Sequence, residues 1–405
     1  METEKIKVYG YRWVVLFAYA IITVVIEIQW LTFAPIAREA RNIYQATSFQ
    51  IDALSMIFMV VFIVVCIPAS YAIDTWGIKK GVGTGAVLTG FFAMVKGFYP
   101  DHYSTMVLAQ TGLAVAQPFI LNAATKVARQ WFPITERAIA VGIATLAQFL
   151  GIIIVMVLTP LLVVKGSDGS SDISHMLMTY GFVSLAGALV LICLLKEKPP
   201  TPPGAETEEP LTVFKGMGHI FRQRDMRLIF PLFFIGLGMF NAISTCIDQI
   251  CQTKGLSMDQ SGLVGGMMLI AGLVGAVILP LLSDRLKKRK LFIVMAMAGM
   301  TPGLIGLTFS SNYTVLLISS FIMGFFLLGA GAPVGFQYSA EVTMPAPEST
   351  SQGLILFIGQ VSGVLFIIGM NALGMVQGLM IFIGLAFVTI VLSLFLHESE
   401  MVRAG

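Results

Sequence analysis

Two carboxylic acids interrupt long apolar runs of this chain, at places where a charged group would be costly. Glu27 lies in Val24-Val-Ile-Glu-Ile, and Asp248 lies in Ala242-Ile-Ser-Thr-Cys-Ile-Asp-Gln. Burial in hydrocarbon favours the neutral form of a carboxyl group, so either residue could carry a proton, or could neutralise a cationic solute directly. For Asp248 an alternative stays open, namely a salt bridge or a solvated place at the outer end of its segment.

Other polar and aromatic side chains in the same runs have the chemistry to bind a small organic solute. Trp30 could stack on a quaternary ammonium, which contributes about 1–2 kcal/mol in a desolvated pocket; the alternative is an indole at the membrane interface. Gln117 and Gln360 could hydrogen-bond a solute hydroxyl, or could instead join neighbouring helices. The candidate binding residues are Gln29, Trp30, Gln117, Asn241, Tyr338 and Gln360.

The segments that carry these residues read as membrane spans. The chain of 405 residues is 57% hydrophobic and 12% charged, with a mean hydropathy of +0.87, whereas a soluble domain carries about 25% charged residues. Apolar runs long enough to cross a bilayer as helices recur throughout. We expect an all-α membrane protein whose twelve spans are 12–37, 50–74, 80–98, 103–131, 136–164, 174–196, 226–252, 258–284, 289–310, 313–340, 348–371 and 374–396.

Basic residues gather at one end of these spans. One side holds Lys5, Lys7, Arg12, Lys79, Lys80, Arg129, Arg137, Lys196, Lys198, Lys215, Arg222, Arg224, Arg227 and the 285–290 cluster, and the other holds Arg38, Arg41, Lys165 and Lys254. The positive-inside rule then predicts that both termini are cytoplasmic. The net charge of +3 reflects this topology, and we expect no nucleic-acid partner. Because Met1–Val8 is charged and the first run is long, no cleaved signal peptide is expected.

The cysteines and histidines give no sign of a cofactor or metal site. Four cysteines lie within predicted spans, with no spacing that suits a disulfide framework or a metal, and four histidines lie at span ends or in loops. No phosphate-binding G-x-x-x-x-G-K-[ST] loop and no nucleophile–base pair is visible. We therefore expect neither an enzyme nor a nucleotide-driven pump, and no cofactor or metal.

A charged signature occurs twice, each time after an apolar run. Asp74 and Asp284 end their runs, and a basic pair follows at the fifth and sixth positions. Such an Asp can cap the next helix or pair with a facing cation, locking one conformation; the alternative is charge that only sets topology. For Asp74 the expected partners are Arg129 and Arg137. Lys126 could snorkel to the cytoplasm instead of reaching the solute cavity. The gating candidates are Asp74, Lys79, Lys80, Arg129, Arg137, Asp284 and Arg285.

The repeated signature predicts two copies of one unit. Pro199-Pro-Thr-Pro-Pro203 and the acidic residues after it favour an extended linker. After them, Leu211–Arg227 has apolar residues at helical spacing between basic ones, which is typical of an interfacial amphipathic helix. We expect a six-helix bundle at 1–196, a cytoplasmic linker with this helix at 197–225, and a second six-helix bundle at 226–405.

The duplicated loops, the six-plus-six count and the linker resemble the major facilitator superfamily, whose loop motif is G-x-x-x-D-x-x-G-x-[RK]-[RK]. The first copy keeps Asp74, Gly77, Lys79 and Lys80 but has Ser70 in the first Gly position. The second keeps Asp284, Arg289 and Lys290 but has Pro280 and Lys287 where glycines are usual. The resemblance implies a solute cavity lined mainly by spans 1, 4, 7 and 10.

A narrower resemblance is to the feline leukaemia virus subgroup C receptor-related branch, which is linked to choline, ethanolamine and haem transport. It rests on Glu27-Ile-Gln29-Trp30, Ala116-Gln117-Pro118-Phe119-Ile120-Leu121, Ala242-Ile-Ser244-Thr245-Cys-Ile-Asp248-Gln249, and Glu341-Val-Thr-Met-Pro345-Ala-Pro-Glu348-Ser-Thr-Ser351-Gln-Gly353-Leu followed by Gln360. The branch usually has Tyr at position 241, Asn at position 248 and a small residue at position 27. Asn241 therefore removes one aromatic wall, which puts choline in doubt.

These observations favour a secondary transporter that moves a small organic solute by alternating access. The candidate residues for the solute cavity include two acidic side chains, Glu27 and Asp248, and one basic side chain, Lys126. This balance of charge favours a cationic or zwitterionic amine such as choline or ethanolamine as the solute, with protons as a possible coupling ion. A proton-coupled organic anion transporter and a non-transporting sensor stay open as alternatives. We expect a monomer in the plasma membrane, and the compact loops favour a prokaryotic inner membrane.

Overall fold

The computed structural model describes residues 8–165, 171–201, 213–344 and 348–399. It divides into two compact units, Met1–Glu208 and Glu209–Gly405. Within the described residues, twelve helical segments are long and apolar enough to cross a membrane, which confirms the twelve predicted spans. The predicted linker falls partly on residues 202–212, outside the described part of the chain.

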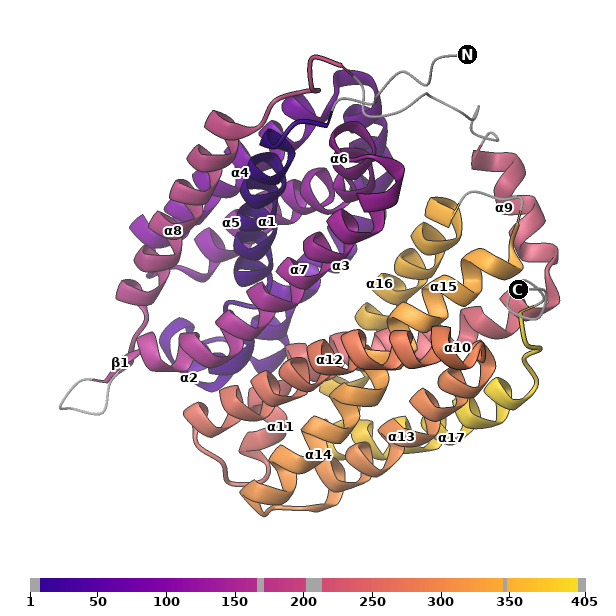
Figure 1. Ribbon diagram of the computed structural model, residues 1–405. Coiled ribbons are helices and arrows are strands. Elements are labelled where there is room, and N and C mark those ends of the chain that lie inside the picture. Colours follow the sequence, from indigo (N-terminus) through magenta and orange to yellow (C-terminus); the bar gives the residue numbers. More distant parts are fainter. Residues whose placement is uncertain (1–7, 166–170, 202–212, 345–347, 400–405) are drawn as a thin grey trace, which may run out of the picture. The chain divides into compact units, whose positions relative to one another are not determined.

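The first unit is built from long helices with short connections (Figure 1). Its elements are α1 (Tyr11–Trp30), η1 (Ala34–Ile36), α2 (Ala37–Tyr44), α3 (Ser48–Trp76), α4 (Ile78–Phe98), α5 (Tyr103–Leu121), α6 (Ala124–Trp131), α7 (Ile134–Leu162), β1 (Val164–Lys165), β2 (Ser171–Asp172) and α8 (Ser174–Leu194). The two strands pair antiparallel between α7 and α8.

The second unit is also helical. Its elements are α9 (Val213–Arg222), α10 (Arg224–Thr245), α11 (Ile247–Gln252), α12 (Met258–Leu286), α13 (Arg289–Phe309), α14 (Tyr313–Phe326), the π-helical turn η2 (Leu327–Gly331), α15 (Ala332–Val342), α16 (Glu348–Leu373) and α17 (Met375–Leu394).

The two units repeat the same neighbours. In the first unit, α1 packs on α7, α5 packs on α3 and α4, and α4 packs on α8. In the second unit, the corresponding pairs are α10 on α16, α14 on α12 and α13, and α13 on α17. The helix starts repeat too. Thr47 and Gln50 form a capping box before α3, and Ser257 and Gln260 form one before α12. Duplication therefore extends from the loop motif to helix capping and packing.

Four of the predicted spans are interrupted within the described residues, and they are the first, fourth, seventh and tenth. Turns at 31–33 and 122–123 separate α1 from η1 and α5 from α6. Cys246 separates α10 from α11, and η2 separates α14 from α15. Irregular backbone at membrane depth is tolerated where protein or a cavity surrounds it. These four spans are the ones that the sequence resemblance assigns to the solute pathway.

Candidate functional site

Glu27 lies in the interior of the first unit beside Gln117. Glu27 is 2% exposed, and the Gln117 side chain on α5 lies beside its carboxyl group. Gly151 of α7 makes room for this arrangement, because a Cβ there would lie 2.8 Å from the Glu27 Cβ and 2.4 Å from the Val24 carbonyl oxygen. The first unit thus holds a carboxyl group and an amide together at the crossing of α1, α5 and α7.

Trp30 and Gln29 are held by other neighbours. The Trp30 indole N–H donates to the Ser55 carbonyl oxygen on α3 at 3.2 Å, so the ring faces are the part of Trp30 that can stack on a solute. The Gln29 amide nitrogen donates to the Ser184 hydroxyl on α8 at 2.9 Å, and its oxygen accepts from Lys96 at 2.8 Å. This setting favours a role for Gln29 in joining helices, and we leave it out of the proposed binding site.

In the second unit, Asn241 and Gln360 lie on two helices that pack against each other. The Asn241 amide on α10 donates to the Gly359 carbonyl oxygen on α16 at 3.2 Å, next in sequence to Gln360, which is half-buried. Small residues allow this contact: a Cβ on Gly359 would lie 2.6 Å from Leu237. Asp248 follows the break at Cys246 and is fully buried on α11.

Tyr338 has a different setting from the one expected for a solute ligand. It is fully buried on α15, and its hydroxyl donates to the His397 carbonyl oxygen at 2.8 Å. His397 belongs to the segment after α17 and lies 3.4 Å from Asp225. Because the hydroxyl is directed at this chain segment, we also leave Tyr338 out of the proposed binding site.

In the first unit, the partner of Asp74 is Lys126, and not Arg129 or Arg137 as expected from the sequence. The Lys126 ammonium lies 3.2 Å from the Asp74 carboxylate and 2.7 Å from the Ile73 carbonyl oxygen, at the end of α3. Arg137 instead donates to the Phe132 carbonyl oxygen. Lys126 therefore reaches the helix end, which was the snorkelling alternative, and Asp74 itself is 73% exposed.

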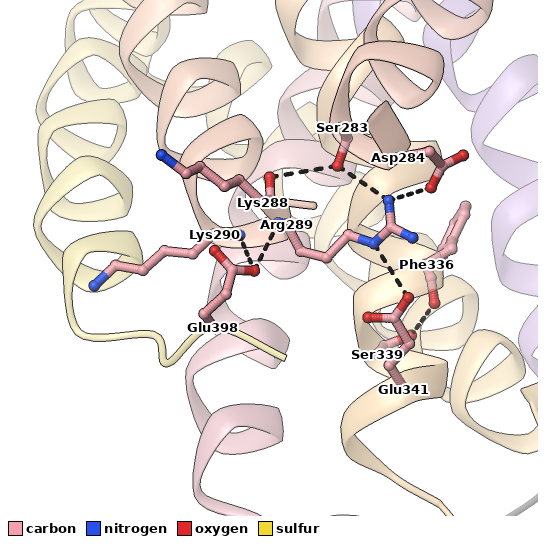
Figure 2. A network of polar contacts seen from close by, with 9 residues as sticks. All are labelled: Ser283, Asp284, Lys288, Arg289, Lys290, Phe336, Ser339, Glu341 and Glu398. Atoms are coloured by element: carbon pink, nitrogen blue, oxygen red, sulfur yellow. Dashed lines mark hydrogen bonds and ion pairs between the residues drawn. The ribbon is translucent and has the colours of Figure 1, made fainter. Parts of the chain in front are cut away.

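In the second unit, the partner of Asp284 is Arg289, while Arg285 is exposed. Figure 2 shows the Arg289 guanidinium directed at Ser283, Asp284 and Glu341. Its Nη1 lies 3.1 Å from the Ser283 hydroxyl and 2.5 Å from Asp284, and its Nε lies 3.1 Å from Glu341. The Arg289 side chain is 6% exposed. A nearly buried cation thus connects the end of α12 to α15.

A carboxylate caps the third long helix of each unit, which sequence reasoning missed. Glu197 accepts the backbone N–H groups of Ile78 and Lys79 at 3.0 and 2.8 Å. In the second unit, Glu398 accepts those of Arg289 and Lys290 at 2.6 and 3.2 Å (Figure 2). The available signal was a Leu-x-Glu triplet after the sixth span of each half, Leu195-Lys-Glu and Leu396-His-Glu.

These caps reveal that the repeated loops differ by one residue. The first capped N–H group belongs to Ile78, at the start of α4, in the first unit and to Arg289, at the start of α13, in the second. One residue, Gly77, joins α3 to α4, whereas Lys287 and Lys288 join α12 to α13. Lys79 and Lys80 are exposed. The structural counterpart of Arg289 is therefore Ile78, which explains why the first unit takes its cation from Lys126.

The family is shown by a family model. The model for the Major Facilitator Superfamily matches residues 13–367 and, in a second match, residues 247–403. The chain belongs to the Major Facilitator Superfamily. It is a multi-pass membrane protein of a transporter family and not an enzyme. This confirms the fold and family that the loop motif and span count predicted.

Three relatives that are similar to this Major Facilitator Superfamily chain come from animals. The human choline/ethanolamine transporter FLVCR2 is 29% identical over 384 residues, covering 91% of this chain and 73% of that protein. Solute carrier family 49 member A3 of Xenopus tropicalis is 28% identical over 381 residues, covering 89% and 78%. An uncharacterised MFS-type transporter of Caenorhabditis elegans, C09D4.1, is 27% identical over 380 residues, and the chain spans 65% of its length. The predicted resemblance to this branch is confirmed.

Solved structures share the fold. A bacterial homologue of the human lysosomal transporter Spinster superposes with a TM-score of 0.75 at 14% identity, covering 96% of this chain and 97% of that one. A D-xylose–proton symporter superposes with a TM-score of 0.70 at 11% identity, covering 96% and 99%. At these identities the likeness concerns architecture.

Proposed function

We propose that this protein transports a small amine, of the choline or ethanolamine class, across a plasma membrane by alternating access, with both termini in the cytoplasm. The observation that carries the substrate class is the buried carboxyl group of Glu27, which lies beside Gln117 of α5. Glu27 precedes Trp30 by three residues on α1. A carboxylate neutralises an ammonium group, and an aromatic face attracts it. Similarity to a choline/ethanolamine transporter supports the same class.

Ethanolamine suits these residues better than choline. Asn241 stands where the resemblance leads us to expect an aromatic residue, and its amide is held on the Gly359 carbonyl oxygen. A quaternary ammonium has no N–H donors and depends on aromatic faces, whereas a primary ammonium can donate to carboxylate and amide oxygens. Glu27 and Gln117 supply such oxygens in the first unit.

The expected alternative of an anion carrier is disfavoured by the positions of the lysines. Lys126 is engaged at the end of α3, and the buried Lys96 donates to three neutral oxygens. Glu27 is a candidate for proton coupling because ionisable side chains buried within membrane spans are the residues that form proton relays. Asp248 is the second candidate, from the other half. A prokaryotic inner membrane stays a prediction from the compact loops.

Transport by purified protein in liposomes tests the proposal. Uptake of radiolabelled ethanolamine and choline is measured at pH 5.5 and 7.5, with and without a proton gradient. We expect saturable uptake that favours ethanolamine and a rise of about tenfold or more in KM for Glu27→Gln, the loss of one charge-assisted contact. Asp101→Asn, which alters an exposed loop carboxylate, is the control and should leave KM unchanged.

Separate outcomes distinguish the alternatives. Saturable uptake of a carboxylate, with none of an amine, would refute the substrate class and leave the family unaffected. Absence of any saturable flux, together with ligand-induced thermal stabilisation, would favour the sensor. If a proton gradient accelerates wild-type uptake but not uptake by Glu27→Gln, Glu27 carries the coupling proton; if it accelerates both equally, that role is refuted.

A further inference from the structure

A buried lysine lies in the first unit, outside the proposed amine site. Lys96 belongs to α4, two residues before its end at Phe98, and its side chain is 1% exposed. A charged side chain inside a membrane span is costly to bury, so it is retained only where its surroundings stabilise it and its charge has a use. Sequence reasoning did not single it out, although it lies inside the predicted span 80–98.

The Lys96 ammonium has three oxygen partners, and all are neutral. It donates to the Gln29 amide oxygen at 2.8 Å, the Gln110 amide oxygen at 3.1 Å and the Thr32 hydroxyl at 3.3 Å. Its nitrogen also lies 5.1 Å from the centre of the Phe33 ring. An ammonium group has three N–H donors, so these oxygens match its capacity, and the ring adds a cation–π contact.

The ammonium fixes the orientation of both amides. Because each amide oxygen is directed at Lys96, each amide nitrogen is directed at another helix. Gln29 donates to Ser184 on α8, and Gln110 donates to the Leu54 carbonyl oxygen on α3 at 3.2 Å. A neutral apolar residue at position 96 would remove the reason for either amide to keep this orientation.

Trp30 depends on the same short stretch of α3. Its indole N–H donates to the Ser55 carbonyl oxygen, the residue after the Leu54 that Gln110 holds. Trp30 also lies between two ligands of the ammonium in the chain, Gln29 and Thr32. The lysine therefore holds the end of α1 on both sides of Trp30, and through Gln110 it holds the α3 backbone to which the indole is bonded.

We infer that Lys96 is a positioning residue that holds the Trp30 indole in place at the end of α1. Lys96 acts through Gln29, Thr32 and Gln110. The use of Trp30 as an ammonium contact rests on the proposed function, whereas the position of Trp30 can be measured without any substrate.

Fluorine NMR of full-length protein labelled with 5-fluorotryptophan provides that measurement. The chain has four tryptophans, and the Trp30 signal is assigned by its loss in Trp30→Phe. We expect Lys96→Met to shift or broaden the Trp30 signal and to leave the signals of Trp13, Trp76 and Trp131 in place. Thr89→Val is the matched control, since Thr89 is fully buried on the same helix and its hydroxyl donates to the Gly85 carbonyl oxygen of that helix.

A second variant guards against failure of Lys96→Met to fold. Gln110→Met keeps the lysine, removes the bond to α3, and should move the same Trp30 signal. An unmoved Trp30 signal in the variants that fold would overturn the positioning role. Movement of all four signals would overturn it too, because it would show general loosening of the unit.

Ligand affinity then separates this role from the proposed function. Dissociation constants for ethanolamine are obtained from ligand-induced thermal stabilisation, and we expect Lys96→Met to bind about tenfold more weakly. In a Trp30→Ala background the same substitution should cause no further loss. If the Trp30 signal moves while affinity stays unchanged, the positioning role stands and Trp30 is no part of the amine site.

Discussion

Glu197 and Glu398 are equivalent residues of the two halves: each follows the sixth span of its half and accepts the first two N–H groups of the third. Both carboxylates face a helix N-terminus, where the backbone dipoles favour negative charge. Each therefore ties the end of one half's chain to the loop that carries the Asp signature. The repeat unit of this protein includes this cap as well as the Asp and the basic residues.

Removing a cap should destabilise the half that contains it. We expect Glu398→Ala to lower the free energy of unfolding by about 0.5–2 kcal/mol. Glu398→Gln should lose less stability than Glu398→Ala, because an amide oxygen still accepts hydrogen bonds. The check is the apparent unfolding midpoint in detergent. Glu136→Ala, which breaks the half-exposed pair with Arg12, is the control and should cost less than about 1 kcal/mol. Equal midpoints for Glu398→Ala and wild type would contradict the capping role.

Gly77 should tolerate no side chain. Its φ is +87°, and a Cβ there would lie 2.2 Å from a carboxylate oxygen of Glu197. Gly77→Ala therefore adds backbone strain of about 1–3 kcal/mol and displaces the cap. Gly83→Ala is the matched control, because its Cβ would meet open space within α4 and alanine favours a helix by about 1 kcal/mol over glycine. In thermal unfolding, Gly77→Ala should lower the unfolding midpoint and Gly83→Ala should raise it. An equal loss of stability in both variants would refute the explanation by backbone strain and displacement of the cap at Gly77.

Hydropathy and internal repetition were enough to predict the fold. Apolar run length determines where a helix can cross a bilayer, and the loop signature at Asp74 and Asp284 marks the repeat. The breaks in spans 1, 4, 7 and 10 were not predicted, since an apolar run shows no signal for a turn such as that at Cys246.

The candidate site was predicted less completely, because sequence does not tell which way a side chain points around its helix. Glu27 and Gln117 do come together, whereas Gln29, two residues on, faces Lys96 and α8. Tyr338 points to the C-terminal segment. Lys126 replaces Arg129 at Asp74 because the first loop is one residue shorter than the second, a difference that the aligned basic pairs conceal.

The Asp74–Lys126 pair should affect turnover and not affinity. Because Asp74 is 73% exposed, the pair contributes no more than about 1 kcal/mol, so Asp74→Asn should slow uptake by no more than about fivefold. Exchanging the two charges, Asp74→Lys with Lys126→Asp, should restore part of the rate. The measurement is initial uptake against solute concentration, with Lys80→Gln as an exposed control. A change in KM with unchanged maximal rate would contradict a gating role.

The Arg289 cluster should be the more costly of the two to break. Arg289 is 6% exposed and Glu341 is 12% exposed, so Arg289→Met leaves Glu341 as a shielded, unpaired carboxylate. The breaking of a buried pair costs about 3–5 kcal/mol, and the exposure of Asp284 places this one at the lower end. Arg289→Lys should retain little of this stability, because one ammonium group cannot reproduce the two directions in which the guanidinium group donates hydrogen bonds.

A double variant separates stability from gating in this cluster. Replacing a buried pair with apolar residues of similar volume is nearly neutral for stability, so Arg289→Met with Glu341→Met should recover most of the unfolding midpoint. Turnover should stay low, because the ion pair between the start of α13 and α15 is still missing. Arg285→Met, at an exposed site, is the control for both readouts. Recovery of turnover along with stability would show that the cluster holds the fold together without gating transport.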